Sequence, residues 1–154
     1  MRLMGVIRGP ERERRIRVVL AASDSTLRRS LAGELESGAF VICAVEDRAV
    51  RAVDAVLAHA PDVFVVGTDL ADSAVIAAAR VAEGLPRTKV VVVTEAPDED
   101  DCLTYLMVGA SGYVGIETGC ASVAAAIQRV AGGQAVVPPA AQRRLLEELR
   151  AQLA

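Results

Sequence analysis

Carboxylate and hydroxyl side chains follow four apolar runs of the sequence, at positions where they could share one site. They are Ser23 and Asp24 after the first run, Asp69 after the third, Thr94 and Glu95 at the end of the fourth, and Glu117 after the fifth. Oxygen ligands of this kind can hold Mg²⁺, and a carboxylate can also act as a nucleophile. If the runs are parallel strands, their carboxyl ends share the sheet edge where α/β proteins have their functional crevice. The chemistry of the chain therefore depends on which side chains point into that crevice.

Other catalytic or ligand-binding patterns are missing from the sequence. It has no Ser-His-Asp order, zinc-ligand spacing or phosphate-binding loop. A turn rich in hydroxyls at Ser23, Ser25 and Thr26 could hold an anion, but it lacks a glycine, and helix capping is favoured. His59 precedes Pro61 at the expected end of a helix, where a cation suits the helix dipole. We therefore expect neither an enzyme nor a bound metal or cofactor.

The composition is typical of one globular α/β domain. The chain has 154 residues, of which 53% are hydrophobic, and its three cysteines lie in apolar patterns that indicate reduced core thiols. A net charge of −3 and a pI near 5.2 give no reason to expect direct contact with nucleic acid. No apolar stretch is long enough to cross a membrane, and the N-terminus has no hydrophobic signal core. We expect a cytoplasmic protein.

The elements that would position the crevice residues follow from the hydrophobic pattern. Strands are predicted over 16–21, 40–45, 63–66, 89–94 and 112–114. Amphipathic helices are predicted after them, with N-caps at Asp24 or Ser25, Asp47, Asp98 and Thr118, and with ends at Gly84 and Gly109. Five such units predict an α/β fold with a doubly wound, five-stranded parallel sheet over residues 16–133, preceded by a polar tail over 1–15.

The last segment, over residues 134–154, is predicted to be a linker followed by an amphipathic helix. Leu145, Leu149 and Leu153 are spaced by four, with Leu146 beside them and charged residues on the other face. A helix with this pattern needs a partner surface. It either packs on its own domain or pairs with a second copy of the chain.

The order and the amino-acid sequences of several segments resemble those of a known family. These segments are 89–94 (KVVVVT), 109–113 (GASGY), 60–63 (APDV) and the glycine pair 132–133. Over residues 16 to 146 the chain resembles the receiver domain of LuxR/NarL-type response regulators. The resemblance implies a flavodoxin-like (CheY-like) fold. It also implies the family's chemistry, which is phosphoryl transfer to an aspartate at the end of the third strand, with an acidic pair for Mg²⁺, a lysine and a switch hydroxyl.

The residues that match those family positions do not have that chemistry. The acidic pair falls on Ala22 and Ser23, the phospho-acceptor on Gly67, and the lysine on Ile116. The switch hydroxyl at Thr94 and the aromatic position at Tyr113 are retained. The sequence therefore indicates an atypical receiver that is not phosphorylated.

Shifted acidic residues leave one alternative open. Asp24 and Asp69 lie one or two residues from the lost acids, and with Glu95 and Glu117 they could rebuild an acidic site. The favoured interpretation is that Asp24 and Asp69 cap helices, because a shift of one residue re-aims a side chain.

Three functions remain open at this stage. The leading hypothesis is a regulatory and dimerisation module of a transcription regulator, either followed by a helix-turn-helix DNA-binding domain or acting as a stand-alone receiver. Its homodimer face would include Leu103, Met107, Tyr113 and Ile127, with Leu145 and Leu149 from the last helix. The alternatives are a sensor that binds a small molecule in the space left by Gly67, and a scaffold for protein interactions without a ligand.

Overall fold

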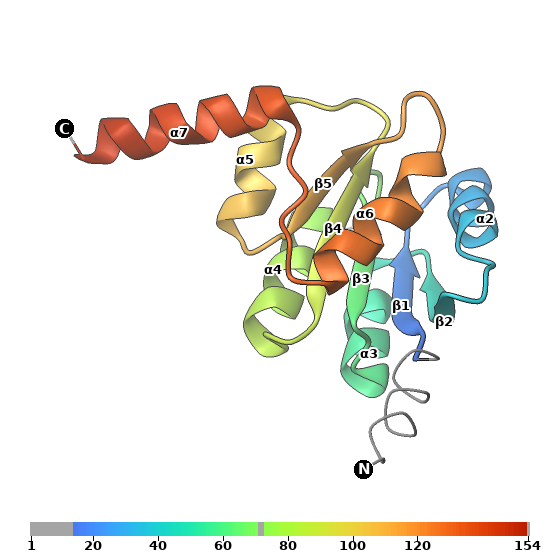
Figure 1. Ribbon diagram of the computed structural model, residues 1–154. Coiled ribbons are helices and arrows are strands. Elements are labelled where there is room, and N and C mark those ends of the chain that lie inside the picture. Colours follow the sequence, from blue (N-terminus) through green and yellow to red (C-terminus); the bar gives the residue numbers. More distant parts are fainter. Residues whose placement is uncertain (1–13, 71–72, 154) are drawn as a thin grey trace, which may run out of the picture.

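Five parallel strands form a single sheet with the order β2-β1-β3-β4-β5 in the computed structural model, which describes residues 14–70 and 73–153 (Figure 1). The strands are β1 (Ile16–Ala21), β2 (Phe40–Glu46), β3 (Val63–Gly67), β4 (Lys89–Thr94) and β5 (Gly112–Gly115). All five begin at the predicted residue, and β2, β3 and β5 end one residue later than predicted. Most of the polar tail expected over 1–15 lies outside the described residues.

The helices cover both faces of the sheet, so the predicted doubly wound fold is confirmed. They are α2 (Ser25–Glu34), α3 (Ala49–His59), α4 (Ala74–Gly84), α5 (Glu99–Met107), α6 (Ala121–Ala131) and α7 (Pro139–Leu153). Side chains of α2 and α6 pack on one face of the sheet, and those of α3, α4 and α5 pack on the other. No helix within the described ranges is long and apolar enough to cross a membrane.

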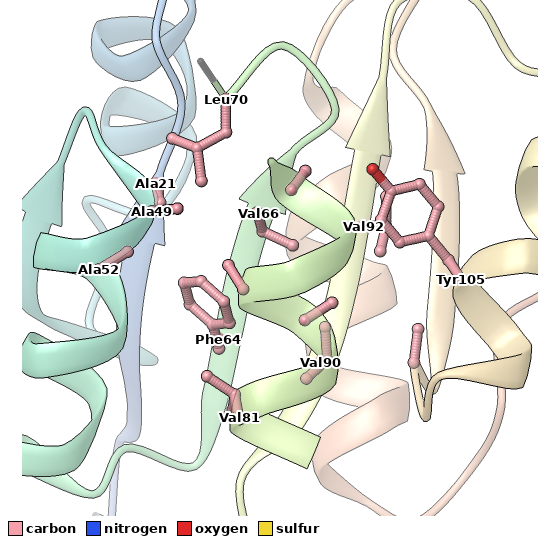
Figure 2. Packing of buried hydrophobic residues seen from close by; sticks show 14 of the residues in the cluster. Ala21, Ala49, Ala52, Phe64, Val66, Leu70, Val81, Val90, Val92 and Tyr105 are labelled. Carbon is pink, nitrogen blue, oxygen red and sulfur yellow. The ribbon is translucent and has the colours of Figure 1, made fainter. Parts of the chain in front are cut away.

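Alternate residues of each central strand enter the two core layers. In β3, Phe64 and Val66 face α3 and α4, whereas Val63 and Val65 face the α2 and α6 layer. Figure 2 shows Phe64 and Val66 between those two helices, with Tyr105 reaching in from α5. All four β3 side chains are fully buried. This double burial explains why the strand reads as a continuous apolar run.

Of the four N-caps predicted from the hydrophobic pattern, two are wrong. Asp24 caps α2 and Asp98 caps α5, as predicted, each through its carboxylate. Asp47 does not cap α3, because that helix begins two residues later, after Arg48. Thr118 does not cap α6, because Gly119 turns the chain with a φ of +113° before the helix begins after Cys120.

The linker before α7 pairs with the edge of the sheet. Val136 forms a parallel bridge with Gly112, accepts a hydrogen bond from the Tyr113 N–H at 2.9 Å, and donates one to the Ser111 carbonyl at 3.0 Å. Beyond it, α7 contacts α5, and Figure 1 shows its C-terminal part extending past α5. The linker therefore covers the beginning of the edge strand β5.

Candidate functional site

The floor of the predicted crevice is apolar. Ala22 and Gly67 are buried at the ends of the neighbouring strands β1 and β3. Ile116, at the family's lysine position, is only 6% exposed and packs with the core layer of α2 and α6. None of these three residues brings a charge to the crevice.

Asp69 does not cap a helix, in contrast to the favoured interpretation of the sequence. The cap of α4 is Ser73, whose hydroxyl accepts a hydrogen bond from the Ile76 N–H at 3.1 Å. The Asp69 carboxylate instead accepts the backbone N–H of Asp24 at 2.8 Å. It thereby connects the turn after β3 to the first residue of the α2 cap.

The same carboxylate fills the space beside Gly67. A Cβ atom at position 67 would lie 2.7 Å from Asp69 Oδ1 and 3.2 Å from the Ala22 Cβ. The Asp69 carboxylate thus lies in the space that Gly67 was expected to leave for a small molecule. This contact could be predicted only in part, because the sequence shows an aspartate two residues after Gly67 but does not show where its side chain points.

The charged residues at the start of α2 are held by local contacts. The Asp24 carboxylate accepts the Thr26 N–H at 3.2 Å, as expected for an N-cap. Arg28 donates to the carbonyl oxygens of Ala22 and Ser23 at 2.8 and 2.6 Å. The Asp24 side chain is therefore bonded to the first turn of α2, and the Arg28 side chain to the loop after β1.

The acidic residues of the crevice do not converge. Glu95 and Glu117 are both exposed. Across residues 14–70 and 73–153, no group of three or more His, Cys, Asp or Glu side chains is placed to hold a metal ion. The described geometry thus gives no support to a rebuilt acidic site.

Thr94, the predicted switch hydroxyl, is buried and bonded inside the fold. It is 3% exposed, and its Oγ1 accepts hydrogen bonds from the Thr68 hydroxyl and from the Ala96 N–H, both at 3.1 Å. The hydroxyl thus joins the loop after β3 to the loop after β4.

Tyr113, the predicted aromatic switch position, is buried with its hydroxyl bonded to the start of α5. It donates to the Asp101 carboxylate at 2.9 Å and accepts from the Asp98 N–H at 3.2 Å. Burial, together with the Asp101 carboxylate, raises its pKa above the ordinary value. Burial first and the Asp101 charge second also raise the pKa of Tyr105 to about 12 and that of Cys102 to about 11. The thiol and both phenols are therefore protonated at neutral pH.

Half of the predicted dimer surface lies in the core. Leu103, Tyr113 and Ile127 are 8%, 1% and 0% exposed, and Tyr113 and Ile127 belong to the two core layers on either face of the sheet. They cannot form a contact surface for a partner in this structure. Met107 is 82% exposed, Leu149 is 49% exposed, and Leu145 is half-buried.

A groove between α5, β5 and α7 was not predicted from the sequence. Its volume is about 430 Å³, and it is lined by Pro97, Asp98, Glu99, Asp100, Cys102, Tyr113, Pro138, Ala140, Ala141 and Arg144. Arg144 of α7 pairs with Asp100 of α5 at 2.8 Å, and Ala141 is 2% exposed. These contacts dock the first half of α7 beside the Tyr113 network.

Comparison with solved structures identifies the architecture. The signal receiver domain of NarL from Mycobacterium tuberculosis aligns with a TM-score of 0.74, at 21% identity, over 78% of this chain and 98% of that domain. A LuxR-family two-component response regulator from Aurantimonas sp. SI85-9A1 aligns with a TM-score of 0.76, at 20% identity, over 88% of this chain and 98% of that one. The chain has the receiver fold.

Sequence comparison adds partial matches to curated proteins. No protein-family model matches the chain. The oxygen regulatory protein NreC of Staphylococcus epidermidis is 34% identical over 67 residues, which are 42% of this chain and 31% of that protein. The chain spans less than half the length of the curated relatives that it matches.

Proposed function

We propose that the chain is an atypical receiver domain of a LuxR-type response regulator, and that it works without phosphorylation as a regulatory and dimerisation module in transcription regulation. It acts in the cytoplasm, and it is not an enzyme. The observation that carries this proposal is Gly67, a residue without a side chain at the end of β3, where the resemblance places the phospho-acceptor.

The surroundings of Gly67 support independence from phosphate. Phosphoryl transfer to a carboxylate in this fold needs Mg²⁺ and a cation for the phosphoryl oxygens. Ala22 and Ile116 supply neither a metal ligand nor a charge. Thr94 and Tyr113, the two retained switch residues, already have partners inside the fold. A receiver of this kind holds one arrangement of its switch residues without a phosphate.

Self-association is proposed to use the exposed stripe of α7. Leu146, Leu149 and Leu153 are 51%, 49% and 87% exposed, and their spacing of three and four residues is that of a helix-pairing seam. The first half of α7 is fixed to α5, so the stripe projects from a defined position. Pairing with α7 of a second copy would bury it. The homodimer contact proposed here therefore lies on α7, whereas the sequence predicted it mainly on the face formed by α5, β5 and α6.

Native mass spectrometry of the purified chain tests this proposal. We expect a dimer whose population is unchanged by Mg²⁺ and beryllofluoride, a phosphate mimic. Leu149→Glu should give a monomer, because it places a charge in the seam. Ile76→Glu, which changes an equally exposed apolar residue on α4 (53% exposed), should leave the dimer intact. A wild-type monomer that dimerises only with the mimic would overturn the proposal, and retained extra mass would favour a small-molecule sensor instead.

A further inference from the structure

The turn after β3 folds Asp69 back toward the sheet. Its first and last residues are joined by a hydrogen bond from the Leu70 N–H to the Gly67 carbonyl at 3.1 Å. Leu70 is 4% exposed and inserts into the core beside Ala21 and Ala49, as Figure 2 shows. The turn is therefore anchored on one side by its backbone and on the other by a buried side chain. Asp69, the residue between these anchors, is left to point over Gly67.

A second contact holds the turn toward β4. The Thr68 N–H donates to the Val93 carbonyl at 3.0 Å, and the Thr68 hydroxyl bonds to Thr94 at 3.1 Å. Every residue of the turn thus has a defined direction. The position of the Asp69 carboxylate follows from the fold of the turn.

The donor to the Asp69 carboxylate is a backbone N–H at the start of a helix. The Asp24 N–H, which donates at 2.8 Å, belongs to the N-cap residue of the ten-residue helix α2. Helix N-termini carry partial positive charge and favour an anion. The contact joins two loops that are 45 residues apart in sequence but that follow neighbouring strands.

The residues beneath the carboxylate are as small as this arrangement demands. An added Cβ at position 67 would lie 2.7 Å from Asp69 Oδ1, so the exposed Asp69 side chain would have to turn aside and give up its hydrogen bond to the Asp24 N–H. The Ala22 Cβ, at 3.2 Å, would also be in tight contact with the added atom. Glycine at 67 and aspartate at 69 are therefore complementary in shape.

We propose that Asp69 is a built-in anion that closes the crevice. Its carboxylate lies where a side chain at position 67 would lie, and it bonds the turn after β3 to the Asp24 N–H at the start of α2. We call this contact between Asp69 and Asp24 the lock, because it holds the two loops together. The regulatory meaning of this lock rests on the proposed function, because it supplies a permanent negative group where a phosphorylated receiver has a transient one. The lock needs neither Mg²⁺ nor a phosphoryl donor.

Amide hydrogen exchange in the full chain tests the bond. In Asp69→Ala the Asp24 amide should exchange at least about tenfold faster than in wild type, as expected for loss of a hydrogen bond to a charged acceptor. The amides of β4 should keep their wild-type rates, which shows that the fold persists. Asp54→Ala, which removes an exposed carboxylate from α3, is the matched control and should change neither. An unchanged Asp24 rate in Asp69→Ala would overturn the proposal.

A double-mutant cycle tests the shape complementarity independently. Gly67→Ala should lower the urea midpoint in the wild-type background and lower it clearly less in the Asp69→Ala background, where the obstructing carboxylate is gone. In the Asp69→Asn background, where a group of the same size remains, the loss should be as large as in wild type. Equal losses in all three backgrounds would show that Asp69 does not occupy this space.

These outcomes are separate from those that test the proposed function. If the Asp24 amide and the cycle behave as expected but the dimer responds to beryllofluoride, the lock stands and independence from phosphorylation falls. If beryllofluoride does not change the dimer population, but the Asp24 amide exchanges at the same rate in Asp69→Ala as in wild type, only the lock is refuted.

Discussion

At the scale of single residues, two hydroxyl groups fix the loop between β4 and α5. The Thr94 hydroxyl accepts the Ala96 N–H, and the Tyr113 hydroxyl accepts the Asp98 N–H. Tyr113 also donates to Asp101 in the first turn of α5. Each hydroxyl therefore satisfies a backbone donor that no helix or strand would pair. The start of α5 depends on side chains that lie on two different strands.

Removing the Tyr113 hydroxyl should destabilise the fold. Tyr113→Phe leaves the Asp98 N–H and the Asp101 carboxylate without this partner, which should lower the free energy of unfolding by about 1–2 kcal/mol. Urea unfolding followed by circular dichroism measures the change. Tyr105→Phe is the matched control, since the Tyr105 hydroxyl makes no hydrogen bond to the described residues and its removal should cost less than about 0.5 kcal/mol. Equal losses for the two variants would contradict this account.

Both tyrosines of the chain should resist ionisation. Burial and the Asp101 charge raise the pKa of Tyr105 to about 12, and burial raises that of Tyr113 also. Since the folded state holds these protons more tightly than the unfolded state, their contribution to stability is complete below pH about 10 and is lost as pH rises toward about 12. Tyrosinate absorbance should therefore appear together with unfolding. A rise centred near pH 10 in a chain that remains folded would refute this.

Sequence reasoning reached the identity of the crevice residues but not their contacts. Gly67, Ala22 and Ile116 could be placed because they follow apolar runs at fixed spacing. The direction of Asp69 could not be predicted, since it depends on the Leu70 anchor and on a hydrogen bond to a residue 45 positions away. Capping, the commoner role for an aspartate before a helix, was favoured for that reason and was wrong for Asp69.

At the scale of elements, the linker and α7 behave as an added edge to the domain. Val136 extends the sheet by one bridge, and α7 then turns onto α5. Ala141 is the buried contact of α7, and Arg144 adds an ion pair with Asp100. Because both charged groups are substantially exposed, the ion pair contributes less than the buried alanine.

Introducing a charge at the α7 contact should release the helix without unfolding the sheet. In Ala141→Glu, amides of residues 142–147 should exchange at least about tenfold faster, because a carboxylate cannot be buried there without a partner. Amides of β3 and β4 should be unaffected. Ala151→Glu makes the same change at an exposed position of the same helix and should leave α7 protected. If the amides of α7 exchange at the same rate in both variants, Ala141 is not the contact that holds α7 on the domain.

The strands were predicted well because most of them are continuous apolar runs bounded by turn residues. The helix starts were predicted less well, since Asp47 and Thr118 have the right residue types but lie two or more positions before the first helical residue. Pairing of the linker with β5 has no local signal, because residues 134–138 contain neither a β-branched run nor an alternating pattern beyond Val136 and Val137.

At the scale of the whole molecule, the segment after Gly133 has two separate tasks. Its first part covers the edge of β5 and the buried Tyr113, and its last part presents the leucine stripe. An uncovered strand edge offers unpaired backbone groups to other chains. The linker thus removes part of one edge from contact with other chains, and the proposed homodimer would use the exposed stripe.

Two truncations should separate these tasks. Removal of residues 134–154 exposes the β5 edge, so the thermal midpoint should fall by at least about 5 °C and light scattering should increase with concentration. Removal of residues 145–154 keeps Val136, Ala141 and Arg144, so the midpoint should stay near the wild-type value while the dimer is lost. If both truncations change the light scattering and the thermal midpoint by the same amount, the linker does not protect the edge of β5.

The fit between Gly67 and Asp69 also restricts the mutational paths open to this chain. An acidic residue at position 67 would have to displace the exposed Asp69 carboxylate, whose Oδ1 lies 2.7 Å from the place of the new Cβ. The displacement would break the hydrogen bond to the Asp24 N–H, so we expect a change at 67 alone to loosen the start of α2. A change at 69 alone breaks the same hydrogen bond. Under the proposed function, an acceptor at 67 would therefore require coupled changes at two positions.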